Sequence, residues 1–402
     1  MKITNLSLIA TLLLGSSAMA LDNTKVTGDA NVYYQTTSAN YFDQGIAGSS
    51  SADTSLNLNV TTDIVKNDTV TITAGAGYTV LSTLGLEKHV VGNTWGNAHT
   101  VTVNGDGTAT VDNVSWINEA WIAATVGNTT VKVGRQALDT PLAYTETWSV
   151  EKNTFDASVL INTDLPNTTI VGAYITSGNG TTTDAGDAGT DSTGSAKVVT
   201  TGAGFYDYVS PKGVAAIGVI NNSIDGLTAQ AWYYNAIQVG KLTWVQADLA
   251  LGDIKLGAQY ATTDVTNSNV YAVMAGYTTA GITATLAYSE VDTAGAAGNN
   301  TATTSNQSKL YTEANWYFGN VTKAGAKATK LSLSVPTSIA DLAFYVTEVD
   351  TVLDSGDMTE YTATASKSFG IVDATLLYVS AQNAGLKAAK DDVVQVYLSS
   401  SF

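Results

Sequence analysis

The segment SLNLNVTTDI, residues 55–64, alternates apolar and polar side chains with a period of two. One face carries Leu56, Leu58, Val60, Thr62 and Ile64, and the other carries Asn57, Asn59, Thr61 and Asp63. Successive side chains of a β-strand point to opposite faces, so this pattern predicts a strand with one apolar face. The polar face is mostly uncharged, which is the first sign of an unusual environment.

The same alternation recurs along the chain, for example in residues 69–80, 253–260 and 282–289. Each run is about ten residues long, the length that a tilted strand needs to cross a bilayer. Short connections, such as 127–128, 252–253 and 279–281, alternate with long ones. The long ones are roughly 37–52, 81–113, 137–154, 178–212 and 291–308, and they are rich in Gly, Asn, Thr and Asp. This arrangement is typical of an outer-membrane barrel with short periplasmic turns and long extracellular loops.

A soluble β-sandwich would also alternate, but its polar faces would meet bulk water and carry many charges. Here only 13% of the residues are charged. Several apolar faces end in tyrosine, as at Tyr78, Tyr260 and Tyr288, and aromatic side chains suit a membrane–water interface. We therefore predict an all-β, transmembrane antiparallel barrel. The candidate strands number roughly nineteen, whereas a closed barrel of this kind needs an even number, so we expect 16–18 and prefer 18. Residues 309–335 fit the up-and-down order least well.

Both ends of the chain fit this interpretation. Residues 1–20 combine Lys2, an apolar middle and Ala18-Met19-Ala20, which predicts a cleaved signal peptide and a barrel domain of residues 21–402. The last segment, VVQVYLSSSF, alternates up to Phe402. In a closed barrel this strand pairs with the first one, near residues 24–36. A terminal aromatic residue also resembles the signal that barrel-assembly machinery recognises.

Composition excludes several classes of protein. The chain has no cysteine, which excludes disulfide scaffolds and thiol chemistry. Its net charge of −17 argues against binding nucleic acid or anionic lipid surfaces. Beyond the signal peptide no apolar run is long enough for a membrane-spanning helix.

The middle of the chain carries a family resemblance. Residues 129–161 contain a strand that ends in VGRQ, then LDTPL, an acidic loop and NTFDA. This order resembles the OprD-like porins and, more closely, the campylobacterial major outer-membrane porins. The resemblance implies an eighteen-stranded, usually trimeric diffusion pore whose third long loop folds inward and narrows the channel. That loop would carry Asp139, Glu146, Glu151 and Lys152, and Pro141 would stiffen its start. Relatives that take up basic substrates line the pore with arginines, whereas this chain has a single arginine, Arg135.

Arg135 and five further charged residues are candidates for the pore lining. Arg135 shares the phase of Val131 and Val133, so it lies at the rim or past a bulge that turns it inward to hold the loop. The other candidates have the inward phase: Asp63, Glu119, Lys132, Lys255 and Glu313. Acids outnumber bases around the expected constriction, which predicts a modest preference for cations.

Other chemistry has weaker support. His89 and His99 lie in the second long loop without a surrounding catalytic or zinc motif. Asp184, Asp187 and Asp191 would suit a divalent cation, although a solvated acidic loop explains them as well.

We therefore predict a porin for passive diffusion of ions and small hydrophilic solutes, with no enzyme activity, no cofactor and no metal. Its expected partners are membrane lipid, lipopolysaccharide, the assembly machinery and two further copies in a homotrimer. The alternatives are a surface adhesin or structural barrel with a closed lumen, and a secreted soluble all-β protein.

Overall fold

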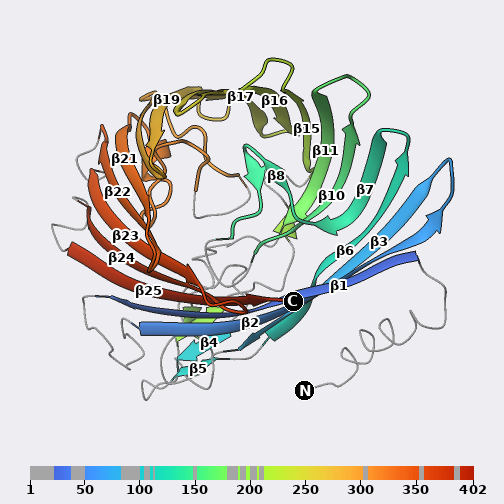
Figure 1. Ribbon diagram of the computed structural model, residues 1–402, viewed down its shortest axis with the longest axis horizontal. Coiled ribbons are helices and arrows are strands. Elements are labelled where there is room, and N and C mark those ends of the chain that lie inside the picture. Colours follow the sequence, from blue (N-terminus) through green and yellow to red (C-terminus); the bar gives the residue numbers. More distant parts are fainter. Residues whose placement is uncertain are drawn as a thin grey trace.

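The computed structural model describes residues 22–37, 50–82, 100–103, 109–111, 114–147, 152–178, 189–190, 196–199, 206–207, 212–301, 307–352, 357–383 and 390–402. In this part of the chain, eighteen antiparallel strands close into one barrel (Figure 1). The preferred strand number is therefore confirmed. The predicted signal peptide, 1–20, lies outside the described residues. No described helix is long and apolar enough to cross a membrane.

The barrel strands follow one another around the wall in chain order. The first nine are β1 (Asp22–Thr37), β2 (Ser50–Lys66), β3 (Thr71–Ser82), β6 (Val114–Val126), β7 (Thr129–Gln136), β10 (Phe155–Asn162), β11 (Thr168–Gly178), β15 (Val214–Asn221) and β16 (Leu227–Ala236). The other nine are β17 (Gly240–Leu251), β18 (Ile254–Thr263), β19 (Ser268–Thr279), β20 (Ile282–Val291), β21 (Lys327–Pro336), β22 (Asp341–Asp350), β23 (Met358–Ser368), β24 (Asp373–Asn383) and β25 (Lys390–Ser401).

Shorter elements lie in the connections between barrel strands. A hairpin of β8 (Asp139–Thr140) and β9 (Ala143–Tyr144) follows β7, and the 3₁₀ helix η1 (Asn320–Thr322) precedes β21. A separate sheet contains β4 (Thr100–Val103), β5 (Ala109–Val111), β12 (Gly189–Thr190) and β13 (Ala196–Val199). Strand β14 (Tyr206–Asp207) pairs only with the end of β11.

The last strand closes the barrel against the first one. Strand β25 pairs with β1 in an antiparallel register that places Leu398 opposite Val32. The register ends in two reciprocal backbone hydrogen bonds between Phe402 and Gly28, both 2.9 Å long. The barrel therefore has no free edge at its seam, as predicted from the alternation at the C-terminus.

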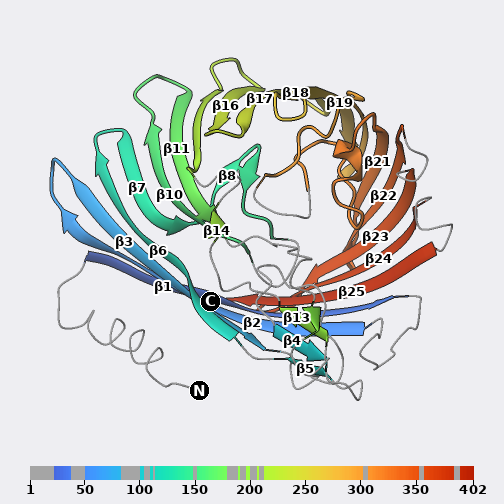
Figure 2. The same cartoon turned by 180° about the vertical axis from the view of Figure 1, so that it is seen from behind.

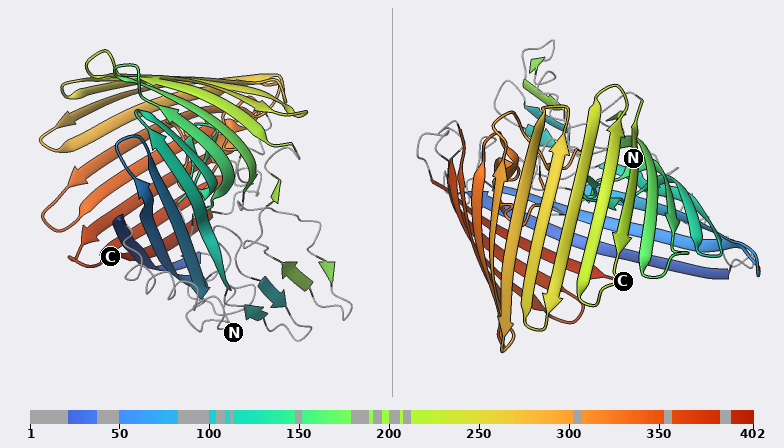
Figure 3. Two further views of the ribbon diagram at one scale, coloured as in Figure 1. Left: turned by 90° about the vertical axis from the view of Figure 1, so that its right-hand side faces the viewer. Right: turned by 90° about the horizontal axis from the view of Figure 1, so that it is seen from above.

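The two ends of the barrel differ in the length of their connections (Figure 3). At one end, called the turn end, tight turns join the strands, and Gly127, Gly252 and Gly281 adopt the left-handed conformation that these turns need. At the other end, called the loop end, lie the longer connections, including those over 137–154 and 292–326. By the pattern of outer-membrane barrels, the turn end faces the periplasm.

The outward face of the wall is apolar along most strands. Leu56, Leu286, Leu331 and Leu376 expose about half of their surface there, with fractions between 47% and 55%. In water such a surface would be a large aggregation liability, whereas lipid tails would cover it. The backbone polar groups pair between strands, so the wall satisfies the requirement for crossing a bilayer.

One sequence-based expectation about the strands is wrong. Residues 310–318 were candidates for a strand, and Glu313 was assigned to its inward face. The structure instead places residues 309–322 in an irregular segment that folds into the barrel, and β21 begins only at Lys327. This segment is the reason that the strand count from the sequence was odd.

Candidate functional site

Two connections at the loop end fold into the lumen and narrow it (Figures 1 and 2). The third loop is the connection 137–154 between β7 and β10, described here except for 148–151. The seventh loop is the connection 292–326 between β20 and β21, described except for 302–306. The inward course of the third loop was predicted from the family resemblance. That of the seventh loop was not.

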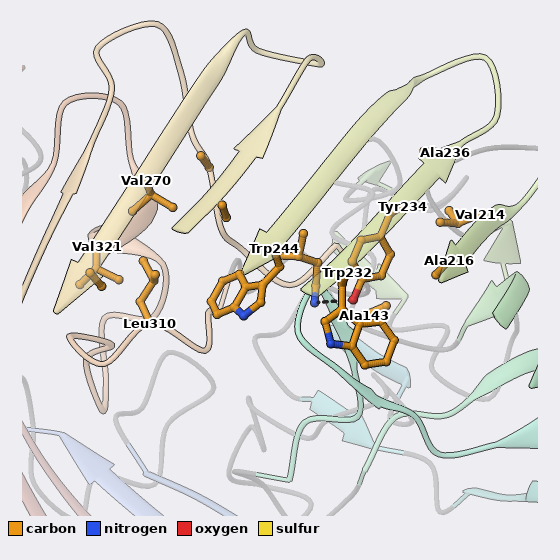
Figure 4. Packing of buried hydrophobic residues seen from close by; sticks show 14 of the residues in the cluster. Ala143, Val214, Ala216, Trp232, Tyr234, Ala236, Trp244, Val270, Leu310 and Val321 are labelled. Carbon is orange, nitrogen blue, oxygen red and sulfur yellow. Dashed lines mark hydrogen bonds between the residues drawn. The ribbon is translucent and has the colours of Figure 1, made fainter. Parts of the chain in front are cut away.

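The third loop is held by an apolar cluster inside the barrel. Leu142 and Ala143, at the tip of the β8–β9 hairpin, are at most 1% exposed. They belong to a buried cluster that includes Trp232, Tyr234 and Trp244, the inward residues of β16 and β17 (Figure 4). The Leu142 backbone N–H also donates to the Tyr234 hydroxyl at 3.3 Å. The inner wall at β16 and β17 is thus a packing surface for this loop rather than a polar lining.

The seventh loop is attached to the inner wall by side-chain clamps. The amide of Gln259, on β18, donates to the Lys309 carbonyl at 2.8 Å and accepts from the Tyr311 backbone N–H at 3.1 Å. The Tyr311 hydroxyl donates to Asp248, on β17, at 2.5 Å. Leu310 and Val321 extend the apolar cluster to this loop (Figure 4). The loop therefore lies along β17 and β18 as a fixed part of the wall.

A second carboxylate fixes the following turn of this loop. Glu360, inward on β23, is 1% exposed. Its two oxygens accept the backbone N–H groups of Asn315, Trp316 and Tyr317 at 2.6, 3.0 and 2.9 Å. Three N–H groups converging on one carboxylate form a strong, charge-assisted anchor.

The third and seventh loops are also joined to each other. The Asn300 amide pairs reciprocally with the backbone of Tyr144, at 3.0 Å to its carbonyl and 3.3 Å from its N–H. The same amide donates to the carboxylate of Glu146 at 2.6 Å. The backbone N–H of Thr301 donates to the Leu142 carbonyl at 3.0 Å. Glu146, a predicted lining residue, is 2% exposed, and its carboxylate links the third loop to Asn300 of the seventh loop.

An ion pair completes this junction on its accessible side. The Lys309 ammonium lies 2.5 Å from Asp139 and 4.7 Å from the centre of the Tyr144 ring. The Asp139 side chain is 91% exposed in this ion pair, and its contribution to the constriction stays a prediction.

Glu313 is the most buried acid of the seventh loop. Its carboxylate accepts the backbone N–H groups of Ser308, Gly319 and Ala314 at 2.7, 3.0 and 3.1 Å, and also the Ser308 hydroxyl. The Lys330 ammonium donates to the Glu313 carbonyl at 2.5 Å. Burial raises the pKa of Glu313 to about 7, against the opposing effect of these donors. The prediction of Glu313 as an inward strand residue is wrong because the loop folds around its side chain.

This raised pKa makes the packing of the seventh loop pH-dependent. In a released loop Glu313 would ionise near its ordinary value of 4.5, whereas the packed loop keeps the proton up to about 7. Rising pH between these values therefore favours release, by at most about tenfold per pH unit. Among the described residues, the titratable groups Lys330 and Tyr144 interact electrostatically with Glu313. Hydrogen exchange of the Gly319 amide, corrected for intrinsic exchange, should lose protection over this range. The Glu313→Gln variant should lack this slope, and an equal slope in both proteins would contradict the assignment.

The lumen that these loops leave open runs beside β24, β25, β1 and β2. A cavity of about 690 Å³ lies between the seventh loop and Thr375, Leu377 and Gln395 of the wall. A second cavity of about 240 Å³ follows along β1 and β2 and includes Asp29 and Lys152. Thr147 and Tyr397 border both cavities. We call these two neighbouring cavities together the passage.

The remaining predicted residues lie at different depths. Glu119 and Lys152 form an ion pair of 2.6 Å, and Lys152 borders the passage. The Lys132 ammonium lies 4.0 Å from the centre of the Trp121 ring. Lys255 has the inward phase at the turn end of β18.

One predicted residue, Asp63, lies farther from the constriction, and another lies outside the described residues. Asp63, near the turn end of β2, accepts hydrogen bonds from Asn23 and Thr73 at 2.7 and 2.8 Å. Glu151 lies outside the described residues, as do His89, His99, Asp184, Asp187 and Asp191. In the described part of the chain, no group of three or more His, Cys, Asp or Glu side chains could hold a metal ion.

Arg135 lies on the outward face at the loop end of β7. Its guanidinium forms an ion pair with Asp156 of β10 at 3.0 Å and donates to the Ile117 carbonyl of β6 at 3.0 Å. Gly134 has a φ of +121°, and an added Cβ there would lie 2.2 Å from the Ala120 carbonyl. The kink aligns Arg135 with its partners across two strands. Of the two sequence-based alternatives, this position is the rim.

Closed strands, an apolar outer surface and a partly obstructed lumen define a pore-type outer-membrane barrel.

No protein-family model and no curated protein matches the sequence. Solved structures with a similar fold include outer-membrane proteins of the Occ type. OpdK of Pseudomonas aeruginosa with vanillate aligns with a TM-score of 0.72 at 12% identity, over 95% of this chain and 99% of OpdK. OccAB4 of Acinetobacter baumannii aligns with a TM-score of 0.72 at 10% identity, over 95% and 98%. OccK2 of P. aeruginosa in complex with glucuronate gives a TM-score of 0.67 at 10% identity, over 95% and 97%. The narrower resemblance to campylobacterial porins stays a prediction.

Sequence reasoning missed the residues that hold the seventh loop, above all Gln259 and Glu360. Both sit at inward positions of strands that otherwise look ordinary. The signal available in the sequence was the interrupted alternation over 309–322. A segment that cannot form a strand of the wall must fold either into the barrel or away from it.

Proposed function

We propose that this protein is a porin of the bacterial outer membrane that lets ions and small hydrophilic solutes diffuse passively through the passage. The observation that carries this proposal is a closed barrel whose inward loops leave open cavities along β24, β25, β1 and β2. The match in fold to the Occ structures supports it. The protein then performs no reaction and needs no cofactor. Homotrimer formation, contact with lipopolysaccharide and recognition of Phe402 by assembly machinery remain predictions of the same proposal.

The proposal includes a modest preference for cations. Two lysines at the constriction are paired with acids, Lys152 with Glu119 and Lys309 with Asp139, and Lys330 donates to the Glu313 carbonyl. Asp29 borders the passage and accepts from the neutral amides of Asn57 and Asn31, so its charge is not cancelled by them. An uncompensated acid in a narrow, water-filled space raises the local concentration of cations.

The test is conductance of the refolded protein, residues 21–402, in a planar bilayer under a potassium chloride gradient. We expect stepwise openings and a reversal potential on the cation-selective side. The Asp29→Asn variant should move the reversal potential toward zero, while Asp164→Asn, in an exposed turn, should not. A reversal potential favouring chloride would refute the cation preference and leave the porin. Insertion without conductance would instead favour a closed-lumen adhesin or structural barrel.

A further inference from the structure

The larger cavity of the passage has an unusual lining for a pore that conducts ions. Three aromatic side chains border it: Trp316 and Phe318 from the seventh loop, and Tyr397 from β25. All three are partly exposed. Amide side chains of Gln307, Asn315 and Gln395 and hydroxyls of neighbouring Ser and Thr residues fill much of the remaining lining. We call this cavity the aromatic chamber.

The charges of this lining are already satisfied within the protein. Glu313 and Lys330 are the charged residues among the described lining residues. The Glu313 carboxylate is buried and saturated by four donors. The Lys330 ammonium donates to the Glu313 carbonyl and lies 5.0 Å from the centre of the Tyr345 ring. The Lys330 ammonium keeps its positive charge, but both groups make their contacts within the protein, and the rest of the described lining is neutral.

One amide in this lining lacks a partner. The Asn315 side-chain nitrogen is shielded from solvent and has no hydrogen-bond acceptor among the described residues. Glu360 holds the Asn315 backbone, whereas the side-chain torsions are not restrained by that contact. A buried donor without a partner is costly, so a turn of the Asn315 side chain toward an acceptor on a molecule in the chamber would remove this cost.

We propose that the aromatic chamber is a binding subsite for neutral, hydroxylated ring molecules, that is, small sugars. The ring faces of Trp316 and Tyr397 suit the apolar C–H faces of a sugar, and the polar side chains of Gln307, Thr147 and Thr375 in the same lining can exchange hydrogen bonds with its hydroxyls. The cavity, about 690 Å³, has the size of a small-molecule pocket, about 300–1,000 Å³. This proposal rests on the porin function and specifies one solute class that it favours.

The experiment measures ion current through single channels while glucose or maltose is added. Binding inside the passage should reduce the current in a saturable way. Glucuronate, which matches glucose in size but carries a carboxylate, should need a clearly higher concentration. The Trp316→Ala and Tyr397→Ala variants change opposite sides of the chamber. Each should raise the half-saturating sugar concentration about three- to tenfold, the effect of losing one aromatic contact. Trp121→Ala, on the lumen face of β6 outside the chamber, should leave it unchanged.

The possible results distinguish failure of the sugar subsite from failure of the porin function. Normal ion conductance without any effect of either sugar would overturn the subsite and leave the porin intact. Equal weakening by Trp121→Ala and Trp316→Ala would also overturn it, because binding would then not be localised to the chamber. No conductance at all would overturn the porin function and the subsite together. The conductance of each variant, measured without sugar, shows whether the seventh loop has kept its position.

Discussion

The Glu360→Ala variant should conduct through a wider and less steady pore than the wild-type protein. The substitution leaves the three N–H groups of residues 315–317 without their acceptor, on a loop that is otherwise packed against the wall. At about 1–3 kcal/mol for each unsatisfied buried donor, the inward position of the loop would lose roughly 3–9 kcal/mol. We expect larger single-channel steps, frequent transitions between levels and passage of larger uncharged polymers.

Matched variants separate this effect from general damage. Glu360→Gln keeps the shape and one good acceptor, so its conductance should lie between those of the wild type and the alanine variant. Glu348→Ala, on the exposed outer face of the neighbouring strand β22, should behave as the wild type. Heat-modifiable migration on a gel should be retained by all of them, since the barrel wall is unchanged. Steps of wild-type size and stability in Glu360→Ala would show that the carboxylate does not hold the loop.

Deletion of Phe402 should strongly reduce the amount of closed barrel. The deletion removes both hydrogen bonds to Gly28 and the aromatic ring that covers this glycine on the lipid face. Two hydrogen bonds and a largely apolar contact at the seam contribute about 3 kcal/mol together. The folded fraction should be measured by gel migration, both after refolding into detergent and in the outer membrane of cells.

A second variant tests the same seam from the other strand. A Cβ at position 28 would lie 2.5 Å from both the Phe402 ring and the Asn57 backbone carbonyl of β2, so Gly28→Val should displace the ring, disturb the β1–β2 pairing and lower the folded fraction as well. Phe402→Tyr should be nearly neutral, and Ser401→Ala serves as the control. If deletion of Phe402 impairs assembly in cells but not refolding in detergent, the residue acts as a recognition signal rather than as part of the seam.

The sequence was sufficient to predict the strands that form the wall of this barrel. Alternation in segments such as 55–64 identifies both faces of a strand, and the alternation of short and long connections gives the order of the strands. Closure by the last strand followed from the apolar phase that ends at Phe402. The inward course of the third loop came from resemblance to known porins, since no pattern in residues 137–147 alone requires it.

The inner architecture was harder to predict because both faces of some strands are apolar. In β16, Trp232 and Tyr234 point inward while the neighbouring Tyr233 points outward, so periodicity does not show that the lumen side is a packing surface. The clamp residues Gln259 and Glu360 look like ordinary polar lining residues in the sequence. Their function depends on which distant loop segment reaches them, and that information is tertiary.

The reciprocal pairing of Asn300 with Tyr144 has a consequence for the dynamics of the channel. Neutral amide contacts are little affected by ionic strength, and here they connect two loops that each touch a different part of the wall. A displacement of one loop must therefore stretch or break its contacts with the other. The two loops should therefore move together. The channel should show the same few discrete current levels at low and at high salt concentration.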